Sequence, residues 1–411
     1  MYTIIKKFFI FARTIILIGT IHAAGTDTAS TTSTTINIPS PLHFASIETT
    51  GSMIPSAPKV SSKSYILVDA NSNQLLAEKN SNEILSPASL TKVMTMYIAS
   101  NAIKNHQISL EDQVFISRHA WEAEGARMFV KQGSKVKLSD IINGIVVASG
   151  NDATIALAEH IAGSEESFAE IMNKTANKLG MKNTHFMNAT GLPNKEHYST
   201  AQDLAVLAAA VITEHPDTLP LYKQKWIKYN NIRQPNRNRM LWANPKVDGM
   251  KTGHTEDAGY CLIASASQED MRLINVQLGA PSDAARTTNT QAILNWGMRF
   301  FNTKLLQQAG AKYNNIRVAG GVNNYSDFGT KENLYVTVPQ DQAKNITVTA
   351  DSGDLIKAPI SKNTNYGNIT VKINDRVITT KPMIALEDNP VGSWWKQSKD
   401  SVAIFMQRTF A

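Results

Sequence analysis

A serine and a lysine three positions apart, Ser89 and Lys92, could together form a covalent acyl-enzyme. The apolar run that follows predicts a helix from Ser89 to about residue 103, in which positions three apart share a face. The lysine amine would then reach a hydroxyl whose own pKa is too high for nucleophilic attack near neutral pH. The partial positive charge of the helix N-terminus would favour an oxyanion at the same place. The pair therefore predicts a serine nucleophile served by a lysine base.

Two later motifs turn this common pair into a specific pattern. Residues 149–151 read Ser-Gly-Asn, and residues 251–253 read Lys-Thr-Gly. Each motif alone would arise easily by chance in a chain of this length. Their order, Ser-x-x-Lys, then Ser-x-Asn, then Lys-Thr-Gly, is that of penicillin-binding proteins and serine β-lactamases.

The three motifs together supply the groups that cleave an amide next to a free carboxylate. Besides the nucleophile and its base, this reaction needs an acid for the leaving amine, oxyanion donors and a cation for the substrate's terminal charge. Lys251 is the second cation, and its positive field would favour a neutral Lys92. Ser149 could relay a proton between the lysines and the leaving nitrogen. Asn151 could bind the substrate's backbone amide and orient the side chain of Lys92.

The third motif and a later arginine are candidates for substrate binding. Thr252 and Arg286 could bind the substrate carboxylate. Gly253 has no side chain, so a substrate strand could approach the edge strand closely there.

The two ends of the chain predict export and attachment. Residues 1–24 resemble a secretory signal peptide, with Lys6, Lys7 and Arg13 before an apolar run and small residues at its end. The alternative for this segment is an uncleaved membrane anchor. Removing it takes away three positive charges and no acids, so the net charge falls from +7 to +4. This mild basicity does not indicate a nucleic-acid partner, but it suits an anionic cell wall or lipid surface.

Cysteine and histidine usage indicates neither a disulfide nor a metal centre. Cys261 is the sole cysteine, and its strand-like apolar surroundings predict a buried structural thiol. The nine histidines are scattered, without the spacing of metal ligands. His185 and His254 flank motifs and are interpreted as structural. No cofactor or metal is therefore expected.

Composition and periodicity divide a chain of 411 residues into several parts. Residues 25–60 are rich in Ser, Thr and Pro and predict a flexible leader. Residues 61–301 hold all the motifs, with strands first, helices in the middle and strands again. This order predicts an α/β (α+β) domain in which helices cover one antiparallel sheet. Residues 302–390 alternate short β-branched runs with turn formers and predict a small all-β domain.

Residues 391–411 predict an amphipathic helix that lies in a membrane interface. One side would carry two adjacent tryptophans and other apolar residues, and the other side mostly polar ones. The alternative is a terminal helix that packs on its own domain. The apolar side comprises Trp394, Trp395, Val402, Phe405, Met406 and Phe410.

The chain resembles the low-molecular-mass D-alanyl-D-alanine carboxypeptidases, the penicillin-binding protein 5 and 6 family. Beyond the three motifs, residues 182–186, 247–255 and 296–301 carry the resemblance, which covers nearly everything after residue 60. It implies a β-lactamase/transpeptidase-like fold and removal of the terminal D-Ala from peptidoglycan pentapeptide stems. It also implies acylation by β-lactam antibiotics, a part in cell-shape control, and a periplasmic enzyme attached to the outer face of the inner membrane through its C-terminal helix.

The resemblance also implies roles for individual residues. Ser89 forms the acyl-ester, Lys92 accepts its proton and Ser149 completes the triad. Lys251 contacts the substrate. The backbone N–H groups of Ser89 and His254 form the oxyanion hole, and Arg286 stands at the position of a carboxylate-binding arginine.

Three other functions are compatible with some of these features. A class A β-lactamase would need a glutamate to activate water, and the candidates Glu165 and Glu166 open a predicted helix instead of an active-site loop. A D,D-endopeptidase that acts on cross-links would share all three motifs. A catalytically inactive wall-binding protein would not need every reactive residue, yet all are present.

Overall fold

The computed structural model describes residues 44–410 except 48, 50 and 354, and it leaves out the side chains of residues 403–410. The predicted signal peptide and the leader up to residue 43 lie outside the described residues.

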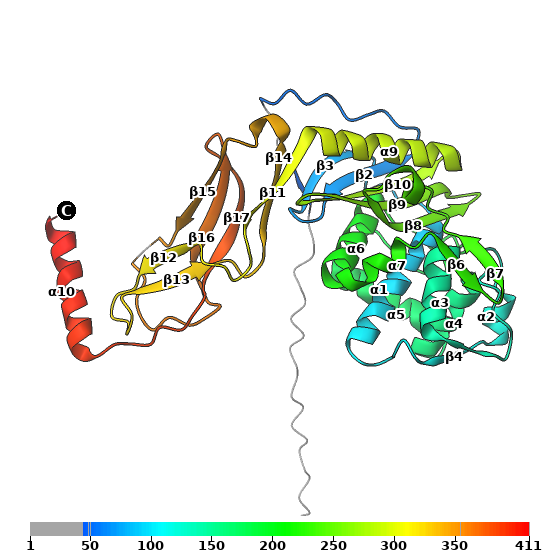
Figure 1. The fold of residues 1–411 in the computed structure, drawn as a ribbon, viewed down its shortest axis with the longest axis horizontal. Coiled ribbons are helices and arrows are strands. Elements are labelled where there is room, and N and C mark those ends of the chain that lie inside the picture. Colours follow the sequence, from blue (N-terminus) through cyan, green and yellow to red (C-terminus); the bar gives the residue numbers. More distant parts are fainter. Residues whose placement is uncertain (1–43, 48, 50, 354, 411) are drawn as a thin grey trace, which may run out of the picture. The chain divides into compact units, whose positions relative to one another are not determined.

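A six-stranded sheet forms the centre of the motif-bearing region (Figure 1). Its order is β1-β3-β2-β10-β9-β8, and every pairing is antiparallel except that of β1 with β3. The edge strand β8 carries the Lys-Thr-Gly motif. The strands are β1 (Ala45–Ser46), β2 (Ser64–Asp69), β3 (Gln74–Lys79), β8 (Val247–Thr255), β9 (Gly259–Gln268) and β10 (Met271–Ala280).

Each face of the sheet contributes to a different hydrophobic core. Successive side chains of a strand point to opposite faces, so one strand supplies residues to both cores. On β2, Tyr65 and Leu67 pack in one core with Ile293 and Leu294 of helix α9 (Asp283–Phe300). Ile66 and Val68 of β2 belong to a second, larger core shared with helices that include α1, α4 and α6. Figure 1 shows α9 along one face of the sheet and α6 and α1 on the other. The sheet thus holds β8 rigidly between two packed layers.

The helical layer supplies the first two motifs. Thr200 caps α6 as its sequence predicts, since its side chain accepts a hydrogen bond from the backbone N–H of Asp203 at 3.0 Å. The helices are α1 (Lys92–Lys104), α2 (Arg118–Glu122), α3 (Leu138–Asn143), α4 (Asn151–Ala162), α5 (Glu165–Leu179), α6 (Ala201–Glu214), α7 (Leu219–Tyr222) and α8 (Met240–Ala243). The shorter turns are η1 (Ala88–Thr91), η2 (Gly144–Ala148) and η3 (Pro216–Thr218), and the hairpin strands are β4 (Gln113–Phe115), β5 (Lys135–Lys137), β6 (Trp226–Tyr229) and β7 (Ile232–Pro235).

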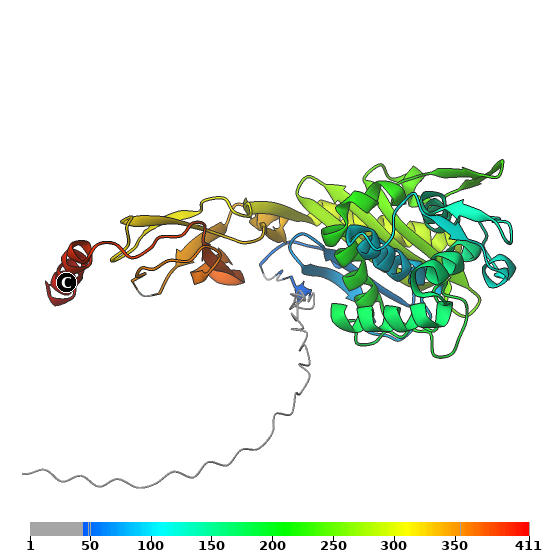
Figure 2. The ribbon, with the colours of Figure 1, turned by 90° about the horizontal axis from the view of Figure 1, so that it is seen from below.

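The C-terminal part is built from β-strands with a hydrophobic core of their own, which includes Phe328, Val336 and Val371. Strands β11 and β14 pair with each other, and five others form a sheet in the order β12-β13-β17-β16-β15. Figure 2 shows these strands in yellow to orange and the last helix, α10 (Trp394–Phe410), in red. The strands are β11 (Phe301–Gln307), β12 (Asn314–Arg317), β13 (Tyr325–Gly329), β14 (Leu334–Pro339), β15 (Ile346–Asp351), β16 (Asn365–Ile373) and β17 (Arg376–Ala385), with the turn η4 (Gln340–Gln342).

The predicted fold class is confirmed: helices cover an antiparallel sheet, and an all-β region follows. One local prediction was wrong: Ser89 lies in the 3₁₀ turn η1, and the α-helix begins only at Lys92. Helix α3 continues directly into the π-helical turn η2, so residues 138–148 are helical throughout. Within the described residues, no helix has both the length and the apolar content required to cross a membrane.

Candidate active site

Ser89 and Lys92 meet because they are three residues apart in a tight turn. In a 3₁₀ turn the side chains at i and i+3 eclipse one another. Ser89 is in η1, Lys92 is the first residue of α1, and the Lys92 Nζ lies 3.0 Å from the Ser89 Oγ. Lys92 is fully buried. The turn therefore aims the nitrogen at the hydroxyl from inside the protein.

Two other acceptors fix the Lys92 nitrogen. It donates to the Asn151 Oδ1 at 2.7 Å and to the Thr190 carbonyl oxygen at 2.6 Å. An ammonium has three hydrogens, and a neutral amine has two hydrogens and a lone pair. If Lys92 loses its proton, its two remaining hydrogens can stay on Asn151 and Thr190. The lone pair then faces Ser89, as a general base requires.

The environment of Lys92 favours the neutral form. Burial and, after it, the positive charge of Arg237 lower the pKa of Lys92 from 10.5 to about 7. Glu165 and Asp152 act in the opposite direction. A substantial fraction of Lys92 is therefore neutral near pH 7.

The second serine and the second lysine form a pair of their own. The Lys251 Nζ lies 2.9 Å from the Ser149 Oγ and 3.0 Å from the Thr252 carbonyl oxygen. The pKa of Lys251 is lowered, first by burial and then by the charge of Lys92. Among the described residues no hydrogen bond joins Lys251 to Ser89, so each lysine serves one serine.

Two glycines let the Ser89 turn lie against its neighbours. A Cβ on Gly253 would stand 3.0 Å from the Pro87 carbonyl oxygen and 3.2 Å from the Ser89 nitrogen. The sequence led us to expect that Gly253 admits a substrate strand, but the closest approach is that of the Ser89 turn itself. A Cβ on Gly191 would overlap the carbonyl oxygen of Ala88, a residue held at φ +47°.

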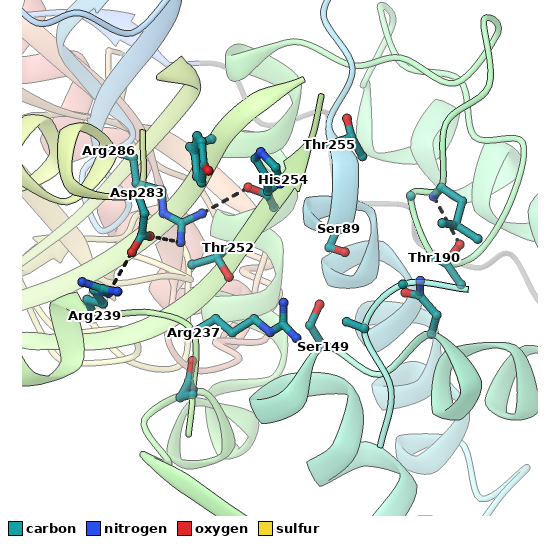
Figure 3. A pocket seen from close by; sticks show the side chains of 18 of the residues that line it. Ser89, Ser149, Thr190, Arg237, Arg239, Thr252, His254, Thr255, Asp283 and Arg286 are labelled. Carbon is teal, nitrogen blue, oxygen red and sulfur yellow. Dashed lines mark hydrogen bonds and ion pairs between the residues drawn. The ribbon is translucent and has the colours of Figure 1, made fainter. Parts of the chain in front are cut away.

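Arg286 is buried, at 6% exposure, and its guanidinium is already engaged. It donates to the carbonyl oxygens of Gly253 at 3.2 Å and Cys261 at 3.3 Å, and it pairs with Asp283 (Figure 3). These contacts tie α9 to β8 and β9. Arg286 thus lines the site as predicted, while these contacts go to the backbone of β8 and β9 and to Asp283 of its own helix.

The motifs border one open pocket of about 690 Å³. Arg237 also lines it and extends its guanidinium towards Ser149 (Figure 3). Lys92 and Lys251 are buried behind the pocket wall and contact the two serines that line it. The predicted site residues that line the pocket are Ser89, Ser149, Asn151, Thr252, Gly253, His254 and Arg286.

A family model described as D-alanyl-D-alanine carboxypeptidase matches residues 51–282. The chain belongs to this family. A second model, described as the C-terminal domain of penicillin-binding protein 5, matches residues 301–390. The resemblance inferred from the motifs is thereby confirmed.

Relatives and solved structures of this carboxypeptidase family cover most of the chain. The D-alanyl-D-alanine carboxypeptidases DacC and DacA of Escherichia coli are 40% and 37% identical to it, over 86% and 87% of this chain and 90% and 91% of theirs. The crystal structure of penicillin binding protein 5 from Haemophilus influenzae superimposes with a TM-score of 0.76 at 35% identity. It covers 82% of this chain and 99% of that one.

Sequence reasoning missed several groups that build this carboxypeptidase site. Arg237 stands between two buried asparagines, Asn236 and Asn238, and no motif marks it. The Glu124 carbonyl oxygen accepts from the Asn151 Nδ2 at 2.6 Å, so both ends of that amide have protein partners. Backbone carbonyls such as that of Glu124 leave no signal in a sequence.

His197 supports the nucleophile turn from behind and was also missed. Its Nδ1 accepts from the Met187 N–H at 3.1 Å, which leaves the proton on Nε2, 2.8 Å from the Thr91 Oγ1. Thr91 in turn donates to the Ala88 carbonyl oxygen at 2.8 Å. Burial lowers the pKa of His197 to about 4, and the positive charges of His185 and Lys92 act in the same direction.

The remaining candidates lie away from the pocket. Cys261 is buried as predicted, and burial raises the pKa of its thiol to about 11. Glu165 and Glu166 begin α5 and do not line the pocket. In the part of the chain that the structure describes, no three His, Cys, Asp or Glu side chains are grouped to hold a metal ion.

Proposed function

We propose that Ser89 is the nucleophile with which this serine-type D-Ala-D-Ala carboxypeptidase removes the terminal D-alanine from peptidoglycan pentapeptide stems. The observation that carries this assignment is the buried Lys92 nitrogen, 3.0 Å from the Ser89 Oγ and with a pKa of about 7. A hydroxyl gains nucleophilic character when a neutral base stands within hydrogen-bond distance.

In the acylation step, the Ser89 Oγ attacks the carbonyl carbon of the penultimate D-alanine while its proton passes to the Lys92 Nζ. The oxyanion that forms accepts hydrogen bonds from the backbone N–H groups of Ser89 and His254. The C–N bond then breaks, and the leaving nitrogen takes the hydroxyl proton of Ser149, which Lys251 replaces across a 2.9 Å contact. D-alanine departs, and an ester on Ser89 remains.

In the deacylation step, a water molecule attacks the ester carbonyl. The proton of the water passes through Ser149 back to Lys251, the Ser89 oxygen leaves with the proton held on Lys92, and the shortened stem is released. A β-lactam follows the same acylation path, but its leaving nitrogen stays attached to the ring-opened product, so the adduct on Ser89 persists longer.

Positive charge at the pocket suits a substrate with a terminal carboxylate. Thr252 lines the wall beside Lys251, and Arg237 is exposed in the same pocket. Arg286 already donates to two backbone carbonyls and pairs with Asp283. We therefore assign the direct contacts with the substrate carboxylate to Thr252 and Arg237, and a positioning role to Arg286. A neutral C-terminal amide should therefore be a poor substrate.

Release of free D-alanine from a soluble pentapeptide, measured beside a cross-linked peptide dimer, tests this function. We expect release from the pentapeptide by the wild-type protein and none by Ser89→Ala. Cleavage of the dimer in preference to the pentapeptide would instead make the protein a D,D-endopeptidase. Failure to release D-alanine from either substrate would refute both assignments.

We further propose export by the signal peptide of residues 1–24 to the periplasm and attachment to the inner membrane through α10. Trp394 and Trp395 are 61% and 64% exposed, and their rings stack at 3.9 Å. Exposed tryptophans at the start of an amphipathic helix favour a membrane interface.

A further inference from the structure

A strongly basic segment borders the active site. Residues 218–247 contain seven lysines and arginines and no aspartate or glutamate. In a chain with 41 basic and 34 acidic residues, such a segment departs from the even mixture of both signs. It includes the β6–β7 hairpin, which Figure 1 labels, and helix α8.

Two tryptophans of this segment are nearly half exposed and touch each other. Trp226 on β6 and Trp242 on α8 are 45% and 44% exposed, with ring centroids 6.1 Å apart in an edge-to-face arrangement. The Arg233 guanidinium lies 4.2 Å from the Trp226 ring centroid, and the Lys225 ammonium lies 5.7 Å from that of Trp242. We call these four residues the tryptophan platform. An exposed apolar patch with a charged rim usually marks a binding surface.

The platform is continuous with the active-site pocket. Trp226 pairs in register with Pro235, which lines the pocket, and Arg239 at the pocket wall directly precedes α8. The opposite face of the hairpin packs through Ile227 on Val147 of η2, two residues before Ser149. A ligand on the platform therefore extends directly into the pocket.

We propose that the tryptophan platform binds the glycan strand and the neighbouring stems of polymeric peptidoglycan, outside the pocket that holds D-Ala-D-Ala. This inference rests on the proposed function, because the occupant is the rest of the same substrate. N-acetylated sugars offer apolar faces to indole rings, and peptide stems carry free carboxylates that lysine and arginine attract. Tryptophan and arginine are also the side chains that most often dominate binding surfaces.

A membrane is the other surface that tryptophans and cations could meet. The position of the platform favours the substrate, since a bilayer pressed against the hairpin would cover the adjoining pocket wall at Pro235 and Arg239. A soluble pentapeptide is too short to use the platform, whereas the polymer reaches both. The platform would thus make the enzyme prefer polymeric peptidoglycan.

The test compares two substrates in the full-length protein with Trp226→Ala/Trp242→Ala and, separately, Lys225→Gln/Arg233→Gln. We expect each double variant to raise KM for pentapeptide-rich insoluble peptidoglycan at least about tenfold. The kcat/KM for the soluble pentapeptide should stay within about twofold. Phe115→Ala removes a 56% exposed aromatic from the β4–β5 hairpin and serves as the matched control.

Co-sedimentation with peptidoglycan separates this proposal from the catalytic one. In a Ser89→Ala background, which should not turn over, the platform variants should sediment less with peptidoglycan than the background protein. Equal sedimentation, or an equal KM for the polymer, would overturn the platform. Loss of binding to vesicles of anionic phospholipid, with peptidoglycan binding intact, would assign it to the membrane instead. Normal penicillin labelling of the variants with Ser89 intact shows that they are folded.

Discussion

At the level of single residues, the proposed mechanism makes the reactivity of Ser89 depend on how far burial and positive charge lower the pKa of Lys92. Lys92 has no solvent exposure and makes all three of its contacts to oxygen atoms. Arg237 is the positive neighbour that lowers the pKa of Lys92, although it comes from a distant segment without a motif. Acylation should therefore follow the neutral fraction of Lys92.

The pH dependence of acylation tests this dependence on Lys92. The second-order rate of penicillin acylation should rise with pH through a midpoint near 7, where Lys92 loses its proton. Arg237→Gln removes a positive charge, which raises the pKa of Lys92 and moves the midpoint to higher pH. Arg239→Gln is the control, because Arg239 pairs with Asp283 at 2.7 Å. An unchanged midpoint in Arg237→Gln, or equal shifts in both variants, would contradict the claim that the charge of Arg237 lowers the pKa of Lys92.

His197 should make the folded state sensitive to acid. Its pKa is about 4 in the folded protein and near 6.5 when unfolded, so between these values only the unfolded chain binds the proton. The free energy of unfolding should fall as the pH drops from 6.5 to 4, by about 3 kcal/mol at most. His197→Gln keeps a donor for Thr91 and should lose this decline.

Urea unfolding at several pH values measures the effect of His197. His106→Asn is the control, because His106 is exposed and asparagine tolerates its positive φ of 57°. The control should keep the wild-type decline. A decline in His197→Gln as steep as in the wild type would show that other groups cause it.

The sequence could predict which candidate side chains come together but not what surrounds them. Ser89, Lys92, Ser149 and Lys251 could be singled out because the spacing within each motif is a local property of the chain. Arg237 and the Thr190 carbonyl reach Lys92 through the tertiary fold, and nothing in their local sequence distinguishes them. The hydrogen bonds from Arg286 to two backbone carbonyls could not be predicted either, because they also depend on the tertiary fold.

At the scale of elements, the site depends on how closely the Ser89 turn approaches its neighbours. Ala88 is held at φ +47°, which is unfavourable for a residue with a Cβ. The Ala88 carbonyl oxygen lies where a side chain on Gly191 would have to be, and the Thr91 hydroxyl donates to it. This contact keeps the turn in the conformation that presents Ser89.

Gly191→Ala tests that contact, with Gly163→Ala as a matched control. Both glycines have nearly the same φ, +82° and +83°, but only Gly191 has neighbours within 4 Å of the added methyl group. Both variants should lose about 1 kcal/mol from the left-handed backbone alone. Gly191→Ala should lose about 1–3 kcal/mol more and acylate at least about tenfold more slowly. Equal stability and acylation rates in the two variants would show that the close approach has no role.

Regular elements were predictable where the local pattern and the tertiary packing agree. The α6 cap at Thr200 and the strands β2 and β10 follow from their sequences. Strand β8 was not delimited, because glycine, lysine and aspartate interrupt its apolar pattern in the segment 247–255. Its conformation is set by pairing with β9, a long-range effect that periodicity does not contain.

At the scale of the whole molecule, the terminal helix is joined to the β-rich region by hydrogen bonds at its base. Asp400 accepts from the Gly320 N–H at 2.8 Å, and Gly392 N–H donates to the Gly320 carbonyl oxygen at 2.8 Å. The fold class could be predicted because the order of strands and helices can be read along the whole sequence. The contacts of α10 could not be predicted, because its amphipathic pattern fits either a membrane or a protein surface.

Truncation of α10 tests the proposed membrane attachment. A protein that ends at Ser393 keeps the pairing of Val391 and Gly392 with the Gly320–Gly321 turn. We expect it to move from the membrane fraction to the soluble fraction, with D-alanine release from pentapeptide unchanged. Trp394→Ala/Trp395→Ala should show a weaker form of the same shift. Retention of both proteins in the membrane fraction would assign the attachment to another segment.

The central claim, that Ser89 carries the acyl group, is tested most directly by mass spectrometry of the protein after brief exposure to benzylpenicillin. The account predicts one added penicilloyl group, located on the peptide that contains Ser89, and no addition to Ser89→Ala. An adduct on any other residue, or equal labelling of Ser89→Ala, would contradict it.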